Sequence, residues 1–172
     1  DSHYILSEKK YPVVFEYAGQ DTATVHISVN DGEPIENEII YGTIKGLKID
    51  RETGEIIAGA LFRLFSMNEN KFTEETAILT AESNNEGIFE FTDVPYGEYI
   101  VRELKPAEGY LPNEENYQAT VSEDEEVIEI TVENDKIPEL KTTATIDGKK
   151  EFTVNGDITI DDVVSYKHLT VG

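Results

Sequence analysis

Short runs of β-forming residues, repeatedly interrupted by glycine, proline and asparagine, dominate residues 42–132 of this sequence. Runs of this kind are typical of strands joined by turns, and helical periodicity is weak along the chain. The sequence therefore predicts an all-β fold in which antiparallel strands form a sandwich. The expected strands are 42–49, 60–66, 77–81, 87–92, 98–104, 118–121 and 127–132. A short helical turn is expected within residues 68–76.

The composition is that of a folded and strongly acidic protein. The 172 residues include 36 Asp and Glu against 14 Lys and Arg, and the net charge of −22 argues against binding to nucleic acid or to an anionic membrane. The absence of cysteine excludes disulfides, thiolate metal sites and cysteine nucleophiles. No stretch approaches the roughly 20 apolar residues that span a bilayer, and no signal peptide is evident. We therefore expect a segment of a longer protein that makes no direct membrane contact.

An internal repeat relates the beginning of the chain to its middle. Residues 4–11 match residues 110–117 at a constant offset, and both copies begin and end with tyrosine. Residues 35–40 match residues 132–137, and the first copy is longer between its last tyrosine and its asparagine. The beginning of the chain is therefore predicted to be the end of a domain that resembles the central one.

The repeat and the strand pattern divide the chain into three expected units. Residues 1–41 are the C-terminal part of a preceding domain, and residues 42–137 form one complete domain. Residues 138–172 contain two β-rich runs that read as the opening strands of a following β-sandwich. This last piece is too short to build a core of its own.

A glutamate lies on the expected inward face of the strand 98–104. Alternation places Tyr99, Val101 and Glu103 on one face. A carboxylate beside tyrosine and valine in a core needs a partner or a proton. Asn134 is one candidate partner, because it continues the inward stripe of isoleucine and valine along 128–132.

A lysine near the end of the first expected strand is the other candidate partner. Strand parity alone favours Lys45, which shares its face with Leu47 and Ile49, over Lys48 on the opposite face. A buried ion pair between a lysine and Glu103, with Asn134 at a strand end, would explain these residues without any reaction.

Several motifs occur in a specific order along residues 42–134. They are Gly-Thr-Ile-Lys-Gly-Leu-Lys-Ile-Asp over 42–50, Ala-Gly-Ala-Leu-Phe-Arg-Leu-Phe over 58–65, Gly-Ile-Phe-Glu-Phe-Thr-Asp-Val-Pro-Tyr-Gly-Glu-Tyr over 87–99, the stretch from Glu103 to Gly109-Tyr110, and Val-Glu-Asn over 132–134. Residues 42–137 thereby resemble the Cna B-type domain, also called the SpaA-like or prealbumin-like domain, of Gram-positive surface proteins and pilins. The resemblance implies a Greek-key, prealbumin-like β-sandwich.

The resemblance also implies an intramolecular isopeptide bond between Lys48 and Asn134, with Lys45 as the reserve lysine. Glu103 would be the catalytic glutamate, which shuttles protons and polarises the Asn134 carbonyl while the amine attacks and ammonia leaves. Burial favours the neutral amine and the protonated carboxylic acid that this chemistry needs. The reaction occurs once per molecule, so the protein is not expected to be an enzyme, and it needs no metal or cofactor.

The flanking units contain the remaining candidate cross-link residues. Asn37 matches Asn134 in the repeat, so it would be the acceptor of the preceding domain, although an exposed linker asparagine is an equally simple interpretation. Residues 141–145 and 161–172 resemble the start of a VaFE-type repeat domain with an internal Thr–Gln ester bond. That resemblance implies Thr142 as the ester-forming residue, but Gln20 and Gln118 are the only glutamines and lie outside this unit. Ordinary strand threonines explain the same pattern.

The resemblance implies a structural stalk segment of a cell-wall-anchored surface protein or pilus-like adhesin outside a Gram-positive cell. Its partners would be neighbouring domains of the same protein, and other domains would contact host matrix protein or glycan. The alternative is that this segment itself binds a matrix protein or glycan. The three histidines, His3, His26 and His168, are isolated, which gives little support to a catalytic triad or a histidine metal site.

Overall fold

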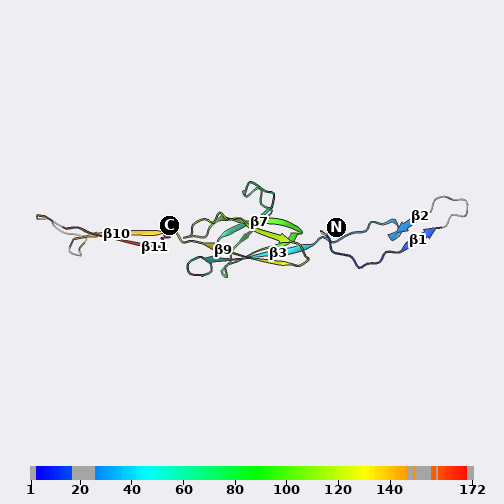
Figure 1. Cartoon of the computed structure of the whole chain (residues 1–172), viewed down its shortest axis with the longest axis horizontal. Helices are drawn as coiled ribbons and strands as arrows, with labels where there is room; N and C mark the ends of the chain where they lie inside the picture. The colour runs from blue at the N-terminus through cyan, green and yellow to red at the C-terminus, as the bar shows by residue number, and fades with distance from the viewer. Residues whose placement is uncertain (1–2, 17–25, 147–148, 150–155, 158, 170–172) are drawn as a thin grey trace.

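A β-sandwich forms the middle of the molecule, and a two-stranded hairpin arm extends from each end of it (Figure 1). The computed structural model of the chain describes residues 3–16, 26–146, 149, 156–157 and 159–169. Within these residues no helix is long and apolar enough to cross a bilayer.

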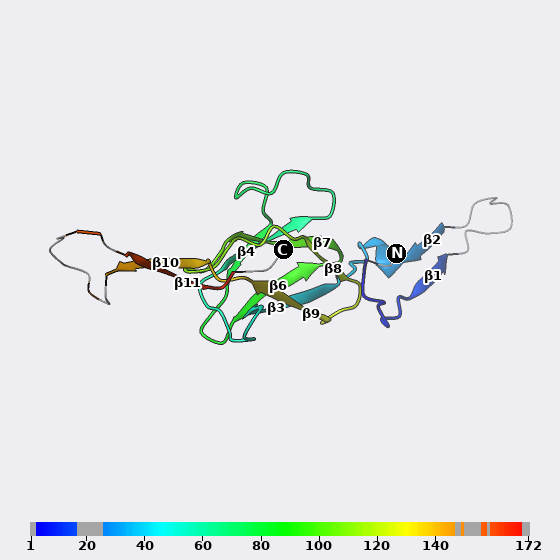
Figure 2. The ribbon, with the colours of Figure 1, turned by 60° about the vertical axis from the view of Figure 1, so that its left-hand side comes forward.

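The sandwich consists of a three-stranded and a four-stranded sheet that face each other (Figure 2). The first sheet has the order β6-β3-β9 and contains β3 (Tyr41–Asp50), β6 (Ile88–Pro95) and β9 (Val127–Asn134). The second has the order β5-β4-β7-β8 and contains β4 (Leu61–Ser66), β5 (Leu79–Glu82), β7 (Gly97–Lys105) and β8 (Tyr117–Val121). All seven strands were predicted from the sequence, with ends that differ by a few residues, and the all-β sandwich is confirmed.

One strand pair differs from the antiparallel arrangement expected throughout. β3 and β9 are neighbours and run parallel, with Asp50 opposite Asn134 and Lys48 opposite Val132. The chain passes through the opposite sheet between these two strands, so both can run from the N-terminal arm towards the C-terminal arm (Figure 1). The C-terminal ends of β3 and β9 therefore lie side by side.

The helical turn expected within residues 68–76 is absent, and the segment is a loop of turns between β4 and β5. The Thr76 hydroxyl accepts a hydrogen bond from the Thr73 N–H at 3.1 Å. Such local bonds from threonine compete with helical backbone pairing. Phe72 anchors the loop, because its ring lies edge-on to Phe65 at 5.1 Å and under the Arg102 guanidinium at 4.8 Å.

Aromatic packing across the sandwich requires a glycine on β3. The Phe62 and Phe89 rings stack with their centroids 3.7 Å apart, and Phe89 lies directly opposite Gly46. A Cβ atom at Gly46 would overlap the Phe89 ring. The inward face of β3 therefore combines a small residue with the buried side chains of Ile44 and Lys48.

Gly46→Ala should destabilise the sandwich by about 1–3 kcal/mol, because the Phe89 ring has to leave its stacked position on Phe62. Thr43→Ala, at an outward position on the same strand, is the control and should change stability by much less. Thermal unfolding of the two variants followed by circular dichroism measures the difference. Equal midpoints would show that the ring has room to move.

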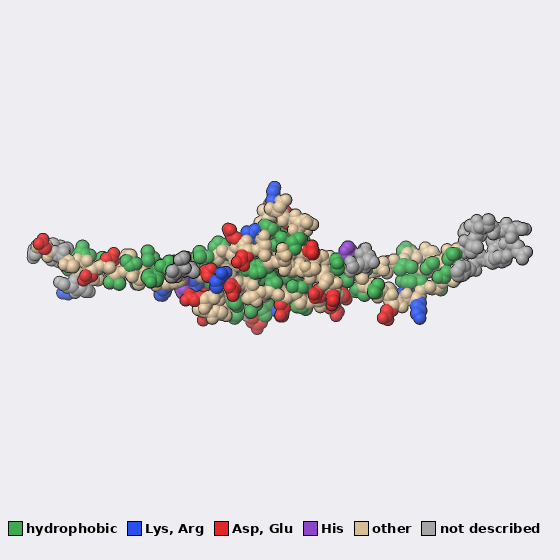
Figure 3. All heavy atoms as spheres, viewed as in Figure 1, with side chains coloured by type: hydrophobic (Ala, Val, Ile, Leu, Met, Phe, Trp, Pro, Cys, Tyr) green, Lys and Arg blue, Asp and Glu red, His purple; other side chains and the backbone are tan. Residues whose placement is uncertain are grey.

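The two arms are antiparallel hairpins. The N-terminal arm contains β1 (Val13–Glu16), β2 (His26–Val29) and the 3-10 turn η1 (Asn30–Gly32), and the C-terminal arm contains β10 (Glu139–Thr145) and β11 (Asp161–Lys167). Apolar side chains are exposed along both arms (Figure 3). The most exposed of them are Leu6, Leu140, Ile160, Val163 and Tyr166. The described residues of the arms therefore do not form an apolar core of their own.

The sequence repeat has a counterpart in backbone hydrogen bonding. In the N-terminal arm, the Ile5 N–H donates to Glu38 O at 2.8 Å and the Ile40 N–H donates to His3 O at 3.1 Å. At the matching positions beside the sandwich, the Leu111 N–H donates to Asp135 O at 2.8 Å and the Ile137 N–H donates to Gly109 O at 2.9 Å. The bridge between Tyr4 and Ile39 likewise corresponds to that between Tyr110 and Lys136.

Candidate functional site: a buried lysine, glutamate and asparagine

Three polar side chains from both sheets meet in the core at one end of the sandwich. Lys48 lies on β3, Asn134 ends the neighbouring β9, and Glu103 lies on β7 in the opposite sheet. They are 0%, 2% and 5% exposed, respectively, so the site is closed to solvent. The parallel register brings the ends of β3 and β9 together, and strand alternation turns all three side chains inward.

The three side chains are within direct reach of one another. Lys48 Nζ lies 2.7 Å from Asn134 Oδ1, and Asn134 Nδ2 lies 3.0 and 2.9 Å from the two carboxylate oxygens of Glu103. Lys48 Nζ is 3.8 Å from Glu103 Oε1. The amine is therefore beside the side-chain amide that it would attack, and the carboxylate is beside the nitrogen that would leave.

Main-chain groups complete the surroundings of the site. Lys48 Nζ also donates to Val132 O at 3.2 Å, and Asn134 Nδ2 donates to Leu111 O at 3.0 Å. The N–H of Asn113 donates to Glu103 Oε2 at 2.9 Å. Such bonds fix the orientation of each buried polar group.

Burial lowers the pKa of Lys48 to about 8, although the attraction of Glu103 partly opposes this effect. Roughly a tenth of the Lys48 amine is therefore neutral at pH 7, whereas an exposed lysine would be almost fully protonated. The neutral amine is the form that acts as a nucleophile.

The orientation of the Asn134 amide gives Glu103 a specific position in this chemistry. The amide carbonyl faces Lys48 and the amide nitrogen faces Glu103. The expected polarisation of the carbonyl by Glu103 does not match this orientation. The Glu103 carboxylate is instead within hydrogen-bond distance of the amide nitrogen, where a group that protonates a departing nitrogen would have to lie.

Lys45, the reserve lysine, lies outside the site. Its side chain is 39% exposed on the outer surface of the sheet and forms an ion pair with Glu90 at 3.5 Å. The parity argument for Lys45 is wrong in physical terms, because the apolar residues that share its face, Leu47 and Ile49, point away from the core. The inward face of β3 is the one that contains Lys48.

The candidate residues of the flanking units are not assembled into sites. Asn37 is exposed in the N-terminal arm, and Thr142 is exposed on β10, opposite Val164. Gln118 belongs to β8 of the central sandwich, where it pairs with Ile100, and Gln20 lies outside the described residues. His26 lies on β2, and His3 and His168 lie at opposite junctions between the sandwich and the arms, where the His3 ring lies tilted against the Tyr96 ring.

Asp50 is a buried residue whose role the sequence analysis did not assign. Its Oδ1 accepts from the N–H groups of Glu52 and Thr53, both at 2.9 Å, and Lys136 Nζ lies 3.1 Å from Oδ2. Burial alone would raise the pKa of Asp50, but these bonds and the lysine hold it well below its usual range. The Asp-Arg-Glu-Thr-Gly sequence over 50–54 is a turn signal that could have indicated this role.

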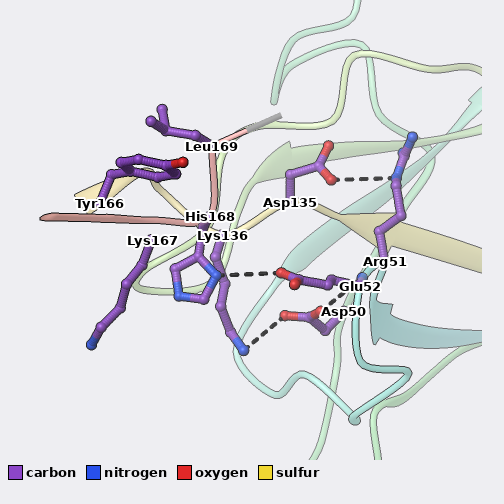
Figure 4. A pocket seen from close by; sticks show the side chains of 9 residues that line it. All are labelled: Asp50, Arg51, Glu52, Asp135, Lys136, Tyr166, Lys167, His168 and Leu169. Carbon is purple, nitrogen blue, oxygen red and sulfur yellow. Dashed lines mark hydrogen bonds and ion pairs between the residues drawn. The ribbon is translucent and has the colours of Figure 1, made fainter. Parts of the chain in front are cut away.

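A cleft separates this turn from the C-terminal arm (Figure 4). Arg51 faces Asp135 at 3.6 Å, and His168 of the arm faces Glu52 at 3.4 Å. No group of three or more histidine, aspartate or glutamate side chains suited to a metal ion occurs within the described parts of the chain. The cleft is therefore a junction between two units and is distinct from the buried Lys48 site.

The fold and the site together define a prealbumin-like β-sandwich with a lysine, a glutamate and an asparagine buried across its two sheets. Residues 42–136, more than half of the chain, match the family described as SpaA, prealbumin-like fold domain. The protein belongs to this family. No curated protein sequence gives a significant match.

Solved structures show the same fold. A variant of BcpA, the major pilin subunit of Bacillus cereus, matches with a TM-score of 0.53 and 19% identity, covering 60% of this chain and 31% of BcpA. The TIE protein of Bacillus anthracis matches with a TM-score of 0.53 and 20% identity, covering 86% of this chain and 33% of that protein. In both cases the match spans about a third of the longer chain.

Proposed function

We propose that this protein is a structural stalk segment of a cell-wall-anchored surface protein or pilus-like adhesin, and that its central domain cross-links itself through an amide bond between Lys48 and Asn134. The single observation that carries the proposal is a buried cluster. In it, Lys48 Nζ and the Glu103 carboxylate both lie within hydrogen-bond distance of the Asn134 side-chain amide. The structural similarity to a major pilin subunit and the strongly acidic composition agree with an extracellular location.

In the proposed reaction, the neutral amine of Lys48 attacks Cγ of Asn134. The bond from Nζ to Cγ forms, and the bond from Cγ to Nδ2 breaks. One proton passes from Nζ to Nδ2 through Glu103, which ends the reaction unchanged, and Nδ2 leaves as ammonia. Because Lys48 and Asn134 are consumed, each molecule reacts once and the protein is not an enzyme with turnover.

Intact mass spectrometry tests the cross-link directly. The measured mass should be lower than the sequence mass by one ammonia, and a tryptic map should contain a branched peptide that joins Lys48 to Asn134. A mass equal to the sequence mass would show that the cluster is an unreacted ion pair. A branch at Lys45 would contradict the assignment of the lysine, because that side chain is on the outer surface.

The flanking units fit the same proposal as parts of neighbouring domains, with 1–41, 42–137 and 138–172 as the three units. Ile35 is 45% exposed in the N-terminal arm, whereas Val132 at the matching position is 0% exposed. Ile35 of the N-terminal arm therefore occupies a position that is buried in the core of the central domain, but it remains exposed in the arm. In a complete preceding domain, Asn37 would accept a lysine of that domain, and Thr142 would form the ester bond of the following one.

A further inference from the structure

The loop 111–115, between β7 and β8, covers the buried site and contacts two of its reacting groups. Leu111 O accepts from Asn134 Nδ2 at 3.0 Å, and the Asn113 N–H donates to Glu103 Oε2 at 2.9 Å. Main-chain groups of one loop thus bind both the Asn134 amide nitrogen and the Glu103 carboxylate beside it. The positions of these two groups therefore depend on the contacts that fix this loop.

The Asn113 side chain ties the loop to its surroundings. It is 9% exposed, and its Nδ2 donates to Tyr117 OH at 3.0 Å and to Glu133 O at 2.9 Å. Its Oδ1 accepts from the Glu115 N–H at 2.8 Å. Glu133 directly precedes Asn134, so Asn113 joins the loop to the strand end that presents the reacting amide.

Tyr117 gives the Asn113 side chain a fixed acceptor. Its hydroxyl donates to Glu115 Oε2 at 2.9 Å and accepts from Asn113. Burial, together with Glu115, raises the pKa of Tyr117 to about 12, so the hydroxyl keeps its proton. The loop, the tyrosine and the strand end therefore form one hydrogen-bonded unit around Asn113.

The N-terminal copy of the repeat contains the same turn with a shorter side chain. Ser7 matches Asn113, and its hydroxyl accepts from the Lys9 N–H at 3.2 Å, as Asn113 Oδ1 accepts from Glu115. A serine therefore maintains the turn itself. The turn therefore does not need the two other hydrogen bonds of the Asn113 side chain, which go to Tyr117 OH and to Glu133 O.

We propose that Asn113 is a positioning residue for the cross-linking reaction. It fixes the loop so that its own N–H holds the Glu103 carboxylate against the Asn134 nitrogen that leaves as ammonia. This inference rests on the proposed function, because it assigns a role within the same reaction. A shift of about 1 Å in such a group can slow a reaction by roughly two orders of magnitude.

The test compares Asn113→Ala with Asn116→Ala, the same substitution at the exposed position that directly follows this loop. Each protein is made by cell-free synthesis, and intact mass is measured at intervals to give the rate of ammonia loss. Asn113→Ala should react at least tenfold more slowly than the wild type, and Asn116→Ala should react at the wild-type rate. Circular dichroism of each product gives the folded fraction by which the rates are corrected.

Two further variants separate positioning from folding. Asn113→Ser keeps the turn bond seen at Ser7 and should recover part of the rate, and Tyr117→Phe should slow the reaction severalfold by removing one partner of Asn113. If Asn113→Ala does not fold, the rate of ammonia loss in Tyr117→Phe, compared with that in Asn116→Ala, tests the inference. Folded Asn113→Ala and Tyr117→Phe proteins that react at the Asn116→Ala rate would overturn the inference. A wild type that never loses ammonia would instead overturn the proposed function.

Discussion

Lys48→Met should lower the thermal unfolding midpoint of the central sandwich by roughly 20 °C or more, whereas Lys45→Met should leave it almost unchanged. The proposed bond closes a loop between positions 86 residues apart, and the chain-entropy model gives about 4 to 5 kcal/mol for a cross-link of this size. A domain of about 100 residues shifts by roughly 4–8 °C for each kcal/mol. Methionine keeps most of the side-chain volume, so little of the effect comes from a cavity.

The two methionine variants form a matched pair because the lysines lie on opposite faces of β3. Lys48 is buried against Asn134, and Lys45 forms a surface ion pair of the kind that contributes at most about 1 kcal/mol. Differential scanning calorimetry with intact mass on the same samples gives both stability and cross-link state. Equal midpoints for the two variants would contradict a cross-link at Lys48.

Glu103→Gln should abolish the cross-link while the sandwich stays folded. Glutamine has the same shape, and its single oxygen at the position of Oε2 can still accept from the Asn113 N–H and from Asn134 Nδ2, but it cannot move a proton to the leaving nitrogen. Glu90→Gln, on the outer surface, is the control and should lose ammonia normally. Complete ammonia loss in Glu103→Gln would contradict the catalytic role of Glu103.

The unlinked Glu103→Gln protein should also become more stable as the pH rises from about 8 to about 10.5. Burial lowers the Lys48 pKa in the folded state, so over this window the unfolded chain binds more protons and folding gains stability with pH. Loss of Glu103, whose charge raises that pKa, extends the window below pH 8. The gain should be about 3 kcal/mol or more, measured in urea against the double variant Glu103→Gln, Lys48→Met. Equal pH dependence in both proteins would contradict the lowered pKa.

Much of the sandwich was predictable because its signals are local. Alternation along β7 and β9 correctly placed Glu103 and Asn134 on inward faces. The face of β3 was not predictable in this way, since Gly46 is buried only because the Phe89 ring of β6 covers it. The role of Asn113 depends on contacts with β8 and β9, which no spacing within its own loop reveals.

The parallel pairing of β3 with β9 was also not predictable from the sequence. A strand with one buried face has the same two-residue period whether its neighbour runs parallel or antiparallel. The direction of β9 relative to β3 follows from the path of the whole chain through both sheets, which is a property of topology.

The parallel pair of β3 and β9 determines how the domain would respond to a pulling force. Force enters at Tyr41, beside one arm, and leaves beyond Asn134, beside the other, so the two strands are sheared along their length and their hydrogen bonds share the load. With the proposed cross-link in place, the force would pass from Lys48 directly into Asn134. Residues 49–133, which include β4 to β8, then lie outside the loaded path. A stalk built from such domains would extend very little before a covalent bond carried the tension.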